Sequence, residues 1–593
     1  MLGSRFFIPF LFLSREVWKT VGPLRKKRVS KVFFLIFLFF VFLQARLGII
    51  QLKQGEYYTC KAIEQETLTV VLEDYPRGKI LDRYQRSLTG TWVANRIVIF
   101  PALIFPKEKG DVVARLILLL KIKDPAQKDE IKAAFFGPPK YLSYRISKDQ
   151  AQAVQKANLP GVFVLPVSFR YGEKPLAVQV VGHLGRIQPG ENYTALKTGN
   201  VKPYEFSDWV GRSGLESYYE QELKATRPYR YVRIFMDAKG RPLPGLTVQV
   251  NTKDNSSDQQ NIITTLDADL QQKVEKITRT RLKKGVVVVM EAASGDILAL
   301  VSRPAYQPQP DKINCSLKAK EKEVFLEKGT ALYQPGSVFK VVVAAAALAE
   351  GVVTPDTVFF CRGAKDRPVR CWYEPGHGKV TFTQAFAQSC NPVFAQLAQK
   401  LGAGKIINYA RRLHLDNQRV IGYPAPIDKR QNLSLISAPF NLINSSLGQG
   451  PVLATPVQIT AMINTIANEG IYKPPRLVQE IKSDGNRTSR YFKPGPYQQV
   501  IRPEVAHQMK KLLEAVVDEG VGQQAYLSNY GSAGKTGSAQ TGGQTTDVNA
   551  WFSGYAPRQK PKYVVTVLVE EGKSGGQTAA PVFKDIMMAL LKE

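Results

Sequence analysis

One apolar segment near the N-terminus constrains the chain more than any other feature. Val32 to Leu43 is an unbroken apolar run, and Leu47 to Ile50 continue it after Gln44 and Arg46. As a helix, residues 32–50 would be about 28 Å long, close to the ~30 Å hydrocarbon core of a bilayer. No second long apolar segment follows in the sequence. We therefore expect a single transmembrane helix over residues 32–50 and one extracytoplasmic body after it.

The residues before this segment predict its orientation. Arg25 to Arg28 and Lys31 form a basic cluster, and such clusters mark the cytoplasmic side of a membrane helix. We expect residues 1–31 to be a cytoplasmic basic tail of a single-pass protein of the cell membrane. A cleaved signal peptide is the alternative, although no small-x-small cleavage site follows clearly.

Length and charge narrow the class of protein. With 593 residues, the chain is too long for one hydrophobic core, so two or more domains are expected. The formal net charge of +31 raises the question of nucleic-acid binding. However, Lys and Arg are spread along the whole chain, and no RNA- or DNA-binding motif is present. We expect a generally basic surface, suited to anionic lipid headgroups or wall polymers, and no nucleic-acid partner.

The cysteines give no metal-binding pattern. None is part of a Cys-x-x-Cys pair, and only four histidines are present, so we expect no metal site and no cofactor. A Cys361–Cys371 disulfide and two free thiols are both compatible with the sequence. Cys390 is interpreted as a small filler rather than a reactive thiol, and His377 as a turn residue rather than a catalytic base. The five cysteines are Cys60, Cys315, Cys361, Cys371 and Cys390.

The first part of the body is predicted to be rich in strands. Residues 51–250 alternate short β-like runs with turn signals, which predicts an extended module. Tyr231–Phe235 is one such run, and Asp237–Gly240 after it is a predicted hairpin turn. Residues 251–261 are polar and turn-rich, and we interpret them as a linker to a second domain over residues 262–593.

The second domain mixes strands and helices. A strand beginning at Ile262 leads into a helix with Asp267 as its N-cap, and two strands flank the turn Ala293–Asp296. Residues 337–520 are rich in helical signals. Strands from both ends with helices between them imply one sheet built from both termini and packed on a helical region, an α+β fold. The last predicted elements are two strands and a helix, over Asn549–Tyr555, Tyr563–Val569 and Pro581–Leu591.

Ser337 and Lys340 are the first candidate catalytic pair. They lie just ahead of the apolar run Val341–Ala349, after a Pro-Gly pair that marks a helix start. Ser337 then falls in the first turn, with Lys340 on the same face and within reach of the serine oxygen. A serine needs a base to take its proton, and a partly desolvated lysine can be that base. The helix N-terminus adds free N–H groups that favour an oxyanion.

Alone, a Ser-x-x-Lys pattern arises by chance in a chain of this length, so the context decides. Two further elements supply that context, namely Ser389-Cys390-Asn391 and Lys535-Thr536-Gly537, the second followed by Ser538. The three elements, in this order, are the signature of serine acyl-enzymes that handle penicillin and D-alanyl peptides.

With these motifs, the chain resembles a class B penicillin-binding protein, a membrane-anchored peptidoglycan D,D-transpeptidase, over nearly everything after residue 30. The resemblance implies a β-rich extended pedestal over residues 51–250, of the penicillin-binding protein dimerisation type. It implies a penicillin-binding, serine β-lactamase-like transpeptidase domain after it, an antiparallel sheet packed on a helical lobe. Further matching segments are Arg77–Arg83, Gly211–Glu216, Gly448–Gly450, Ala454–Pro456, Trp551–Phe552 and Gly554–Pro557.

The sequence departs from the family pattern at two places. Tyr84-Gln85 stand where the family usually shows Asn-Gly, and Asn549 stands where His is frequent. Neither departure touches the three catalytic motifs.

The resemblance implies a role for each residue of the first two motifs. Ser337 is expected to be the nucleophile that forms an acyl-enzyme with the penultimate D-Ala of a stem peptide, with Lys340 as its base. Ser389 would relay a proton to the leaving D-Ala nitrogen. Asn391 would hold Lys340 and the substrate amide.

The third motif is expected to bind the substrate. Lys535 would supply positive potential, and the hydroxyls of Thr536 and Ser538 would bind the terminal carboxylate. Gly537 would let the backbone pass close to the substrate. Backbone N–H groups of Ser337 and Ser538 would form the oxyanion hole.

The function implied is the cross-linking of peptidoglycan stem peptides in cell-wall synthesis, with covalent inhibition by β-lactam antibiotics. A D,D-carboxypeptidase or β-lactamase is the enzymatic alternative, and a β-lactam receptor or scaffold is the non-enzymatic one. A β-lactamase would need a positioned deacylating base, and the anchored pedestal argues against it. A receptor should carry a multi-pass signalling region, but only one membrane segment is predicted. A scaffold could have lost the catalytic residues, but all three motifs are intact.

Glu73-Asp74 resemble the start of a glycosyltransferase motif, but Arg77 and Ile80 stand where that motif requires Phe and His. We therefore expect no glycosyltransferase activity. By resemblance, a separate membrane glycan polymerase would be the partner.

Overall fold

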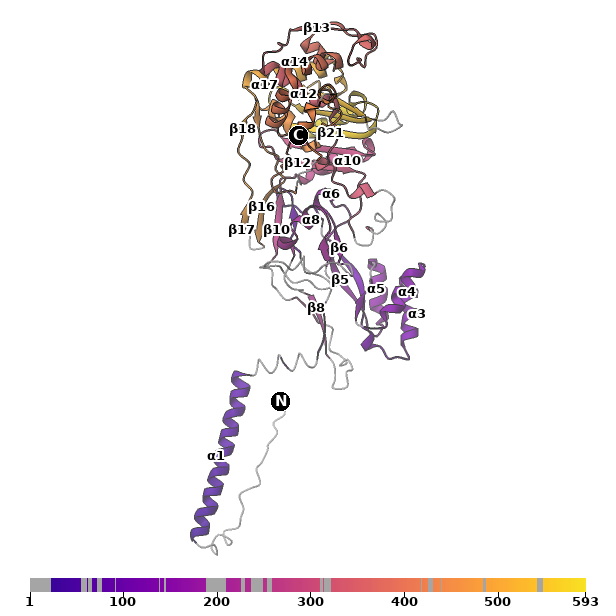
Figure 1. Cartoon of the computed structure of the whole chain (residues 1–593). Helices are drawn as coiled ribbons and strands as arrows, with labels where there is room; N and C mark the ends of the chain where they lie inside the picture. Colours follow the sequence, from indigo (N-terminus) through magenta and orange to yellow (C-terminus); the bar gives the residue numbers. More distant parts are fainter. Residues whose placement is uncertain are drawn as a thin grey trace. The chain divides into compact units, whose positions relative to one another are not determined.

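The structure is a computed structural model of the whole chain (Figure 1). It divides into two compact units, residues 1–72 with 230–252 and residues 73–229 with 253–593. The residues it describes are 23–54, 61, 67–71, 77–90, 92–137, 139–142, 145–187, 209–224, 230–235, 249–252, 259–309, 313, 322–417, 419–424, 430–438, 440–483, 487–540 and 548–592.

The first unit contains the predicted membrane segment. Helix α1 (Pro23–Lys53) includes a stretch from Lys27 to Lys53 that is long and apolar enough to cross a membrane. The side chains of Val32–Leu43 are exposed, as expected for a helix whose solvent is lipid. The same unit holds an antiparallel sheet in the order β1-β8-β9, formed by β1 (Thr67–Val71), β8 (Arg230–Phe235) and β9 (Gln249–Thr252). The predicted turn Asp237–Gly240 lies outside the described residues.

The second unit begins with a small sheet that is covered by helices. Its order is β4-β3-β5, and Ile97 and Ile99 of the central strand are buried against the helices. The sequence predicted strands here, and helices α3 (Lys109–Leu120) and α4 (Pro125–Ala134) were not expected. In α3, the buried apolar residues Val112, Leu116 and Leu120 recur every four positions, as in a helix with one buried face. The elements are β3 (Trp92–Ile99), β4 (Lys140–Tyr141), β5 (Val162–Phe169), α3 (Lys109–Leu120), α4 (Pro125–Ala134) and α5 (Lys148–Ala157).

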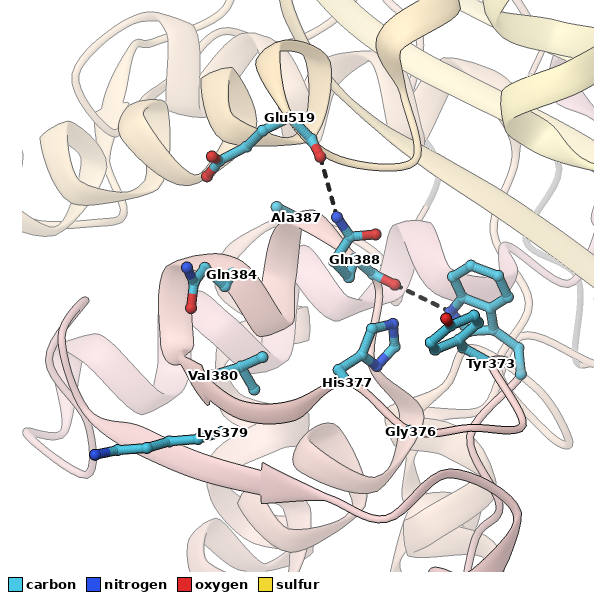
Figure 2. Close-up of a pocket in the computed structure, with 10 residues that line it drawn as sticks. Tyr373, Gly376, His377, Lys379, Val380, Gln384, Ala387, Gln388 and Glu519 are labelled. Carbon is cyan, nitrogen blue, oxygen red and sulfur yellow. Dashed lines mark hydrogen bonds between the residues drawn. The ribbon is translucent and has the colours of Figure 1, made fainter.

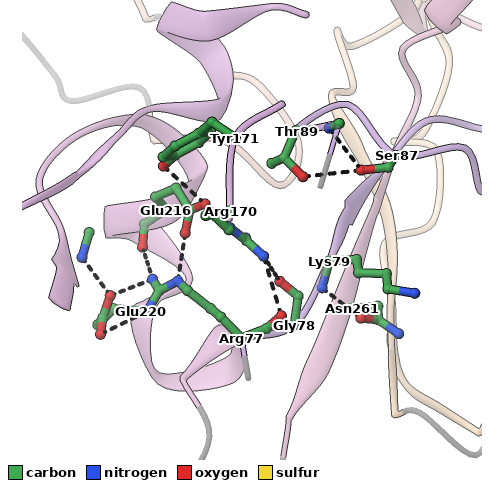
Figure 3. A network of polar contacts seen from close by, with 12 residues as sticks. Arg77, Gly78, Lys79, Ser87, Thr89, Arg170, Tyr171, Glu216, Glu220 and Asn261 are labelled. Carbon is green, nitrogen blue, oxygen red and sulfur yellow. Dashed lines mark hydrogen bonds and ion pairs between the residues drawn. The ribbon is translucent and has the colours of Figure 1, made fainter. Parts of the chain in front are cut away.

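Two of the segments that carry the family resemblance, Arg77–Arg83 and Gly211–Glu216, meet in a buried ion network (Figure 3). Arg77 Nε donates to Glu216 Oε2 at 2.7 Å, and Arg77 Nη2 donates to Glu220 Oε2 at 2.5 Å. Arg170 Nε donates to Glu216 Oε1 at 2.7 Å. Burial alone would raise the pKa of Glu216, but the charges of Arg170 and Arg77 outweigh it and lower that pKa. The network joins α8 (Gly214–Tyr218) and α9 (Glu220–Leu223) to the segment at Arg77.

The departure from the family pattern at Tyr84-Gln85 falls in a tight turn after β2 (Ile80–Leu81). Gln85 has a φ of 64°, in the left-handed region where glycine is least strained. The fully buried Asp82 stabilises this turn by accepting the backbone N–H of Tyr84 at 2.9 Å and that of Arg86 at 2.7 Å. The turn therefore forms with glutamine where the family has glycine.

A four-stranded sheet in the order β17-β16-β10-β2 connects segments that are far apart in the sequence. Strand β10 (Gln260–Thr264) pairs in parallel with β2 and antiparallel with β16 (Val478–Ser483), which pairs with β17 (Thr488–Tyr491). Of the predicted linker 251–261, residues 253–258 lie outside the described residues, while its two ends continue β9 and begin β10.

The larger part of the second unit is built on a five-stranded antiparallel sheet in the order β12-β11-β21-β20-β19. Its strands come from both ends of residues 262–593, as the sequence predicted. They are β11 (Gly285–Glu291), β12 (Ile297–Arg303), β19 (Ala533–Gln540), β20 (Val548–Ala556) and β21 (Tyr563–Gly572).

Helices cover both faces of this sheet, which explains the unbroken apolar run in β11. Val286 and Val288 belong to one core with α16 (Pro456–Ala467), while Val287 and Val289 belong to another with α10 (Ala268–Arg281) and α18 (Ala580–Leu591). The predicted N-cap of α10 is confirmed, since Asp267 accepts the N–H of Asp269 at 3.0 Å.

The helical lobe surrounds α12 (Lys340–Ala349), whose residues are buried from Lys340 to Leu348. This helix packs against α14 and α17 (Figure 1). The other lobe helices are α13 (Phe382–Ala387), α14 (Asn391–Arg412), α15 (Asn441–Ser446) and α17 (Pro503–Asp518).

Short elements complete the second unit. The two-stranded pairs are β6 (Leu184–Arg186) with β7 (Trp209–Gly211), β13 (Val358–Cys361) with β14 (Gly378–Thr381), and β15 (Ile471–Tyr472) with β18 (Gln498–Gln499). The short helical elements include α6 (Val178–Val181), η1 (Pro101–Leu103), η2 (Lys322–Phe325), η3 (Lys328–Thr330), η5 (Gly363–Lys365), η6 (Leu433–Ser437), η7 (Gln523–Ala525) and η8 (Gly575–Ala579).

Candidate active site

Ser337 lies in a short 3₁₀ turn, η4 (Gly336–Phe339), which leads into α12. The predicted helix therefore begins with a tight turn, and its α-helical part starts at Lys340. Gly336 opens the turn with a φ of 53°, and its N–H donates to the carbonyl of Gly448 at 3.0 Å. A Cβ on Gly448 would lie 1.9 Å from the Gly336 oxygen, so the Gly-Gln-Gly segment packs directly on the turn. Ser337 itself is partly exposed.

The Lys340 ammonium connects the Ser337 turn to the second motif. The side chain is fully buried. Its Nζ donates to Asn391 Oδ1 at 2.7 Å, to the Ser389 carbonyl at 2.8 Å and to Ser389 Oγ at 3.2 Å. Burial lowers the pKa of Lys340 to about 7, so a neutral amine is accessible near neutral pH. The first two motifs therefore share one desolvated lysine.

Ser389 lies between α13 and α14, in the Ser389 turn (residues 388–390), and Asn391 follows this turn directly. Ser389 has a φ of 54°, a left-handed conformation that costs a residue with a Cβ about 1–3 kcal/mol. Cys390 is fully buried, and its N–H donates to the Ala385 carbonyl at 2.8 Å. Asn391 is the first residue of α14. Such strain persists only where the surrounding structure holds the turn in place.

The third motif lies on β19, beside the Ser337 turn. A Cβ on Gly537 would lie 2.7 Å from the Pro335 oxygen, so a glycine is required for this close approach. A Cβ on Gly336 would lie 3.0 Å from the Ser538 oxygen. The strand and the turn are thus in backbone contact on the side of the predicted oxyanion hole.

Lys535 is the second buried lysine of the site. Its Nζ donates to the Thr536 carbonyl at 3.2 Å and lies 5.6 Å from the ring centre of Phe386. Burial, and then repulsion from Lys340, lowers the pKa of Lys535 well below its ordinary value. Two buried lysines whose pKa values are both lowered by burial are typical of a functional site.

The predicted carboxylate-binding hydroxyls differ in exposure. Thr536 is buried, whereas Ser538 is exposed and its Oγ accepts the N–H of Gly575 at 3.1 Å. The Ser538 hydroxyl therefore keeps its own proton for a further acceptor. Sequence reasoning missed Gly575, where a Cβ would lie 2.4 Å from the Gly537 oxygen. Its only signal is the Gly575-Gly576 pair after a strand.

A hollow of about 600 Å³ lies beside the Ser389 turn (Figure 2). Trp372 Nε1 donates to the Gln388 carbonyl at 3.0 Å, and Gln388 Nε2 donates to the Glu519 carbonyl at 3.0 Å. The residue before Ser389 is therefore held from two sides. The lining residues are Trp372, Tyr373, Gly376, His377, Lys379, Val380, Gln384, Ala387, Gln388 and Glu519.

Together, these elements form a site suited to acyl transfer. The buried Lys340, which directly follows the Ser337 turn, bonds to the Ser389 hydroxyl and the Asn391 amide, and the β19 motif contacts the same turn. The residues that the structure brings together in this way are Ser337, Lys340, Ser389, Asn391, Lys535, Thr536, Gly537 and Ser538.

Two family models match the chain. The penicillin binding protein transpeptidase domain matches residues 285–588, just over half of the chain. The penicillin-binding protein dimerisation domain matches residues 73–264.

Curated relatives match over most of their length. Stage V sporulation protein D of Bacillus subtilis (strain 168) is 27% identical, over 96% of this chain and 86% of the relative. Peptidoglycan D,D-transpeptidase MrdA of Haemophilus influenzae (strain ATCC 51907 / DSM 11121 / KW20 / Rd) is 26% identical, over 86% of this chain and 83% of the relative.

Solved structures share the fold. A chain of a peptidoglycan synthase complex that coordinates polymerization and crosslinking superposes with a TM-score of 0.66 at 24% identity, covering 95% of this chain and 99% of that one. A chain from the complex between penicillin-binding protein PBP2 and MreC from Helicobacter pylori gives a TM-score of 0.65 at 21% identity, covering 88% and 98%. With the two family models, the site and this fold, the chain belongs to the penicillin-binding protein transpeptidase family, as a class B penicillin-binding protein.

Proposed function

We propose that this chain is a peptidoglycan D,D-transpeptidase that cross-links stem peptides through an acyl-enzyme on Ser337. One observation supports this most directly. Lys340, three residues after Ser337, is buried, and its ammonium donates hydrogen bonds to Ser389 and Asn391. A buried amine that can lose its proton near neutral pH is suited to accept the serine proton.

In the acylation step, Ser337 Oγ attacks the carbonyl carbon of the penultimate D-Ala, and its proton passes to the neutral Lys340 amine. The N–H groups of Ser337 and Ser538 stabilise the resulting oxyanion. Removing one such donor typically lowers the rate constant by a factor of about 10²–10³. The C–N bond then breaks. Ser389 protonates the departing D-Ala nitrogen and regains a proton from Lys340, its partner at 3.2 Å.

In the second step, the amine of another stem peptide attacks the carbonyl carbon of the Ser337 ester. A new amide forms, the ester C–O bond breaks, and the amine's proton returns through Lys340 to the serine oxygen. Because Lys340 accepts one proton and releases it again in each of the two steps, the enzyme returns to its starting protonation state.

The terminal carboxylate of the donor peptide is bound by the β19 motif. The Thr536 and Ser538 hydroxyls donate to it. Its negative charge favours the protonated form of Lys535, which burial alone disfavours, so that Lys535 supplies positive potential when the substrate is bound. The carboxylate of a penicillin occupies the same place while Ser337 attacks the β-lactam carbonyl. The drug's leaving amine stays attached to the acyl group, so β-lactams inhibit covalently.

We propose the following organisation around this site. Residues 1–31 form the cytoplasmic tail, 32–50 the transmembrane helix, 51–250 the pedestal, 251–261 the linker and 262–593 the transpeptidase domain. The basic residues before the membrane segment support a cytoplasmic N-terminus and an extracytoplasmic catalytic domain. Similarity to chains from a peptidoglycan synthase complex and from a complex with MreC supports a glycan polymerase and other wall-synthesis proteins as partners.

The test uses the full-length protein in detergent, with nascent glycan strands made by a purified membrane polymerase. Free D-Ala and cross-linked peptides are quantified by mass spectrometry. We expect one D-Ala released per cross-link, with both products lost in Ser337→Ala and kept in Ser434→Ala, an exposed serine of the same domain. D-Ala release without cross-links would instead identify a D,D-carboxypeptidase, and turnover of penicillin a β-lactamase.

A further inference from the structure

Four potential metal ligands, spread over residues 361–390, converge at the Ser389 turn. Their ligand atoms all lie within 4.8 Å of one another. The three cysteines are free thiols and are buried. The donors are Cys361 at the end of β13, Cys371 in the following loop, His377 just before β14 and Cys390 at the start of α14.

The spacing of these atoms matches a tetrahedral zinc site. Zn–S bonds of about 2.3 Å and Zn–N bonds of about 2.0–2.1 Å place neighbouring ligand atoms about 3.5–3.8 Å apart. The Cys371 Sγ and His377 Nδ1 atoms lie 3.5 Å apart. Because all four atoms fall within 4.8 Å, small side-chain rotations are enough to bring them around one ion.

The backbone is folded tightly to bring these donors together. Cys361 pairs with Gly378 across the β13–β14 hairpin, and the Cys371 N–H donates to the Gly363 carbonyl at 3.1 Å. Gly363 and Gly376 have φ values of 67° and 88°. A Cβ on Gly376 would lie 2.6 Å from the Cys361 oxygen, so this approach requires glycine.

The surroundings of His377 orient its ring. The ring packs against Trp372 and Tyr373, with centroids 5.7 and 5.3 Å away, and it lines the hollow shown in Figure 2. Its Nδ1 atom points to the Cys371 sulfur, which is the orientation that ligation requires. This contact explains the Gly-His-Gly turn without a role for His377 as a catalytic base.

A disulfide between two of the cysteines accounts for less of the geometry. It would use two sulfur atoms and leave the third thiol and the imidazole beside it without a common partner. Three sulfurs and one imidazole nitrogen are a ligand set that zinc prefers.

We propose that the chain binds one Zn²⁺ ion as a structural Cys₃His site, with Cys361, Cys371, His377 and Cys390 as ligands. The sequence argument against a metal depended on the lack of Cys-x-x-Cys pairs. The ligands here come instead from three separate segments that only the fold brings together.

The site has a consequence for catalysis because Cys390 stands between Ser389 and Asn391. A bond from the Cys390 sulfur to zinc fixes the left-handed turn at Ser389, whose φ is 54°. It also fixes Ser389 and Asn391, the two residues that accept hydrogen bonds from Lys340. The proposal of a zinc site is independent of the proposed enzymatic activity. Only its effect on catalysis rests on the proposed function.

The test is metal analysis of the full-length protein, purified in detergent from zinc-containing medium and dialysed against a weak chelator. We expect about one zinc per chain. Cys361→Ser and His377→Ala should lose most of it, while His507→Asn, which changes a described histidine outside the cluster, should keep it. Zinc far below stoichiometry in the parent would overturn the proposal, as would an intact mass that shows a disulfide within the cluster.

A second measurement needs no variant, so it is unaffected if a substitution unfolds the protein. The zinc in the parent is replaced with Co²⁺, and the absorption spectrum is recorded. We expect the intense visible bands of tetrahedral Co²⁺ together with thiolate charge-transfer bands in the near ultraviolet. The weak spectrum of octahedral Co²⁺, without thiolate bands, would contradict a Cys₃His site.

Discussion

Replacing Lys340 with arginine tests the proposed base while keeping a positive charge at that position. With its pKa lowered to about 7, about half of the Lys340 side chains are neutral at pH 7. At the ordinary value of 10.5, only about one in 3,000 would be neutral. An arginine stays protonated, and the loss of a general base costs about 10²–10⁴ in rate. We therefore expect Lys340→Arg to lower the second-order rate constant for penicillin acylation by about 10³ or more.

The assay follows fluorescent penicillin binding over time at several drug concentrations. Lys328→Arg is the matched control, since Lys328 is also a buried lysine, with its Nζ 2.5 Å from Glu570 in an ion pair outside the motif set. We expect the control to acylate within a few-fold of the parent, and thermal unfolding should show that both variants are folded. If Lys340→Arg acylates as fast as the parent, Lys340 is not the base and the mechanism is wrong.

The same mechanism predicts the direction of the pH dependence. Lys340 acts in its neutral form, and protonation removes that form as the pH falls through the lowered pKa of about 7. The acylation rate constant of the parent should therefore decrease as the pH is lowered from about 8 to 6. A rate constant that rises over this interval would exclude a neutral lysine as the base.

Three further predictions follow from other parts of the molecule. Lys535→Arg should keep part of the acylation rate and Lys535→Ala should lose most of it, because the proposed role of this lysine is a positive charge beside the substrate carboxylate, which arginine keeps and alanine removes; equal rates in the two variants would contradict this. Glu216→Gln should lower the free energy of unfolding, measured by chemical denaturation, by about 3–5 kcal/mol. The reason is that Arg77 and Arg170 are then buried beside a neutral amide. A change under about 1 kcal/mol would show that the network contributes little to stability. Protease applied to sealed, right-side-out cells should digest the body and spare residues 1–31, and full protection of the body would reverse the proposed orientation.

Much of the transpeptidase fold is readable from the sequence because local signals and the tertiary fold agree there. Two strands are predicted around the turn Ala293–Asp296, and β11 and β12 form there, with two cores covering the valines of β11. Asp267 predicts a helix start and caps α10. The order of the three motifs predicts a shared site, and Lys340 does contact the second motif directly.

Other features depend on contacts that no local pattern encodes. Helix α3 is amphipathic, yet it lies in a region where short β-like runs dominate the sequence. The need for glycine at Gly575 arises from the Gly537 backbone, which the fold brings to the same place. The cysteine and histidine cluster likewise becomes visible only when β13, β14 and α14 are assembled.

The central claim is that Ser337 is the residue acylated, and one measurement tests it most directly. The purified full-length protein is incubated with benzylpenicillin, its intact mass is recorded, and the modified peptide is sequenced by tandem mass spectrometry. The mechanism predicts one drug adduct per chain, located on Ser337 and lost in Ser337→Ala. An adduct on another residue, or one that persists in Ser337→Ala, would contradict it.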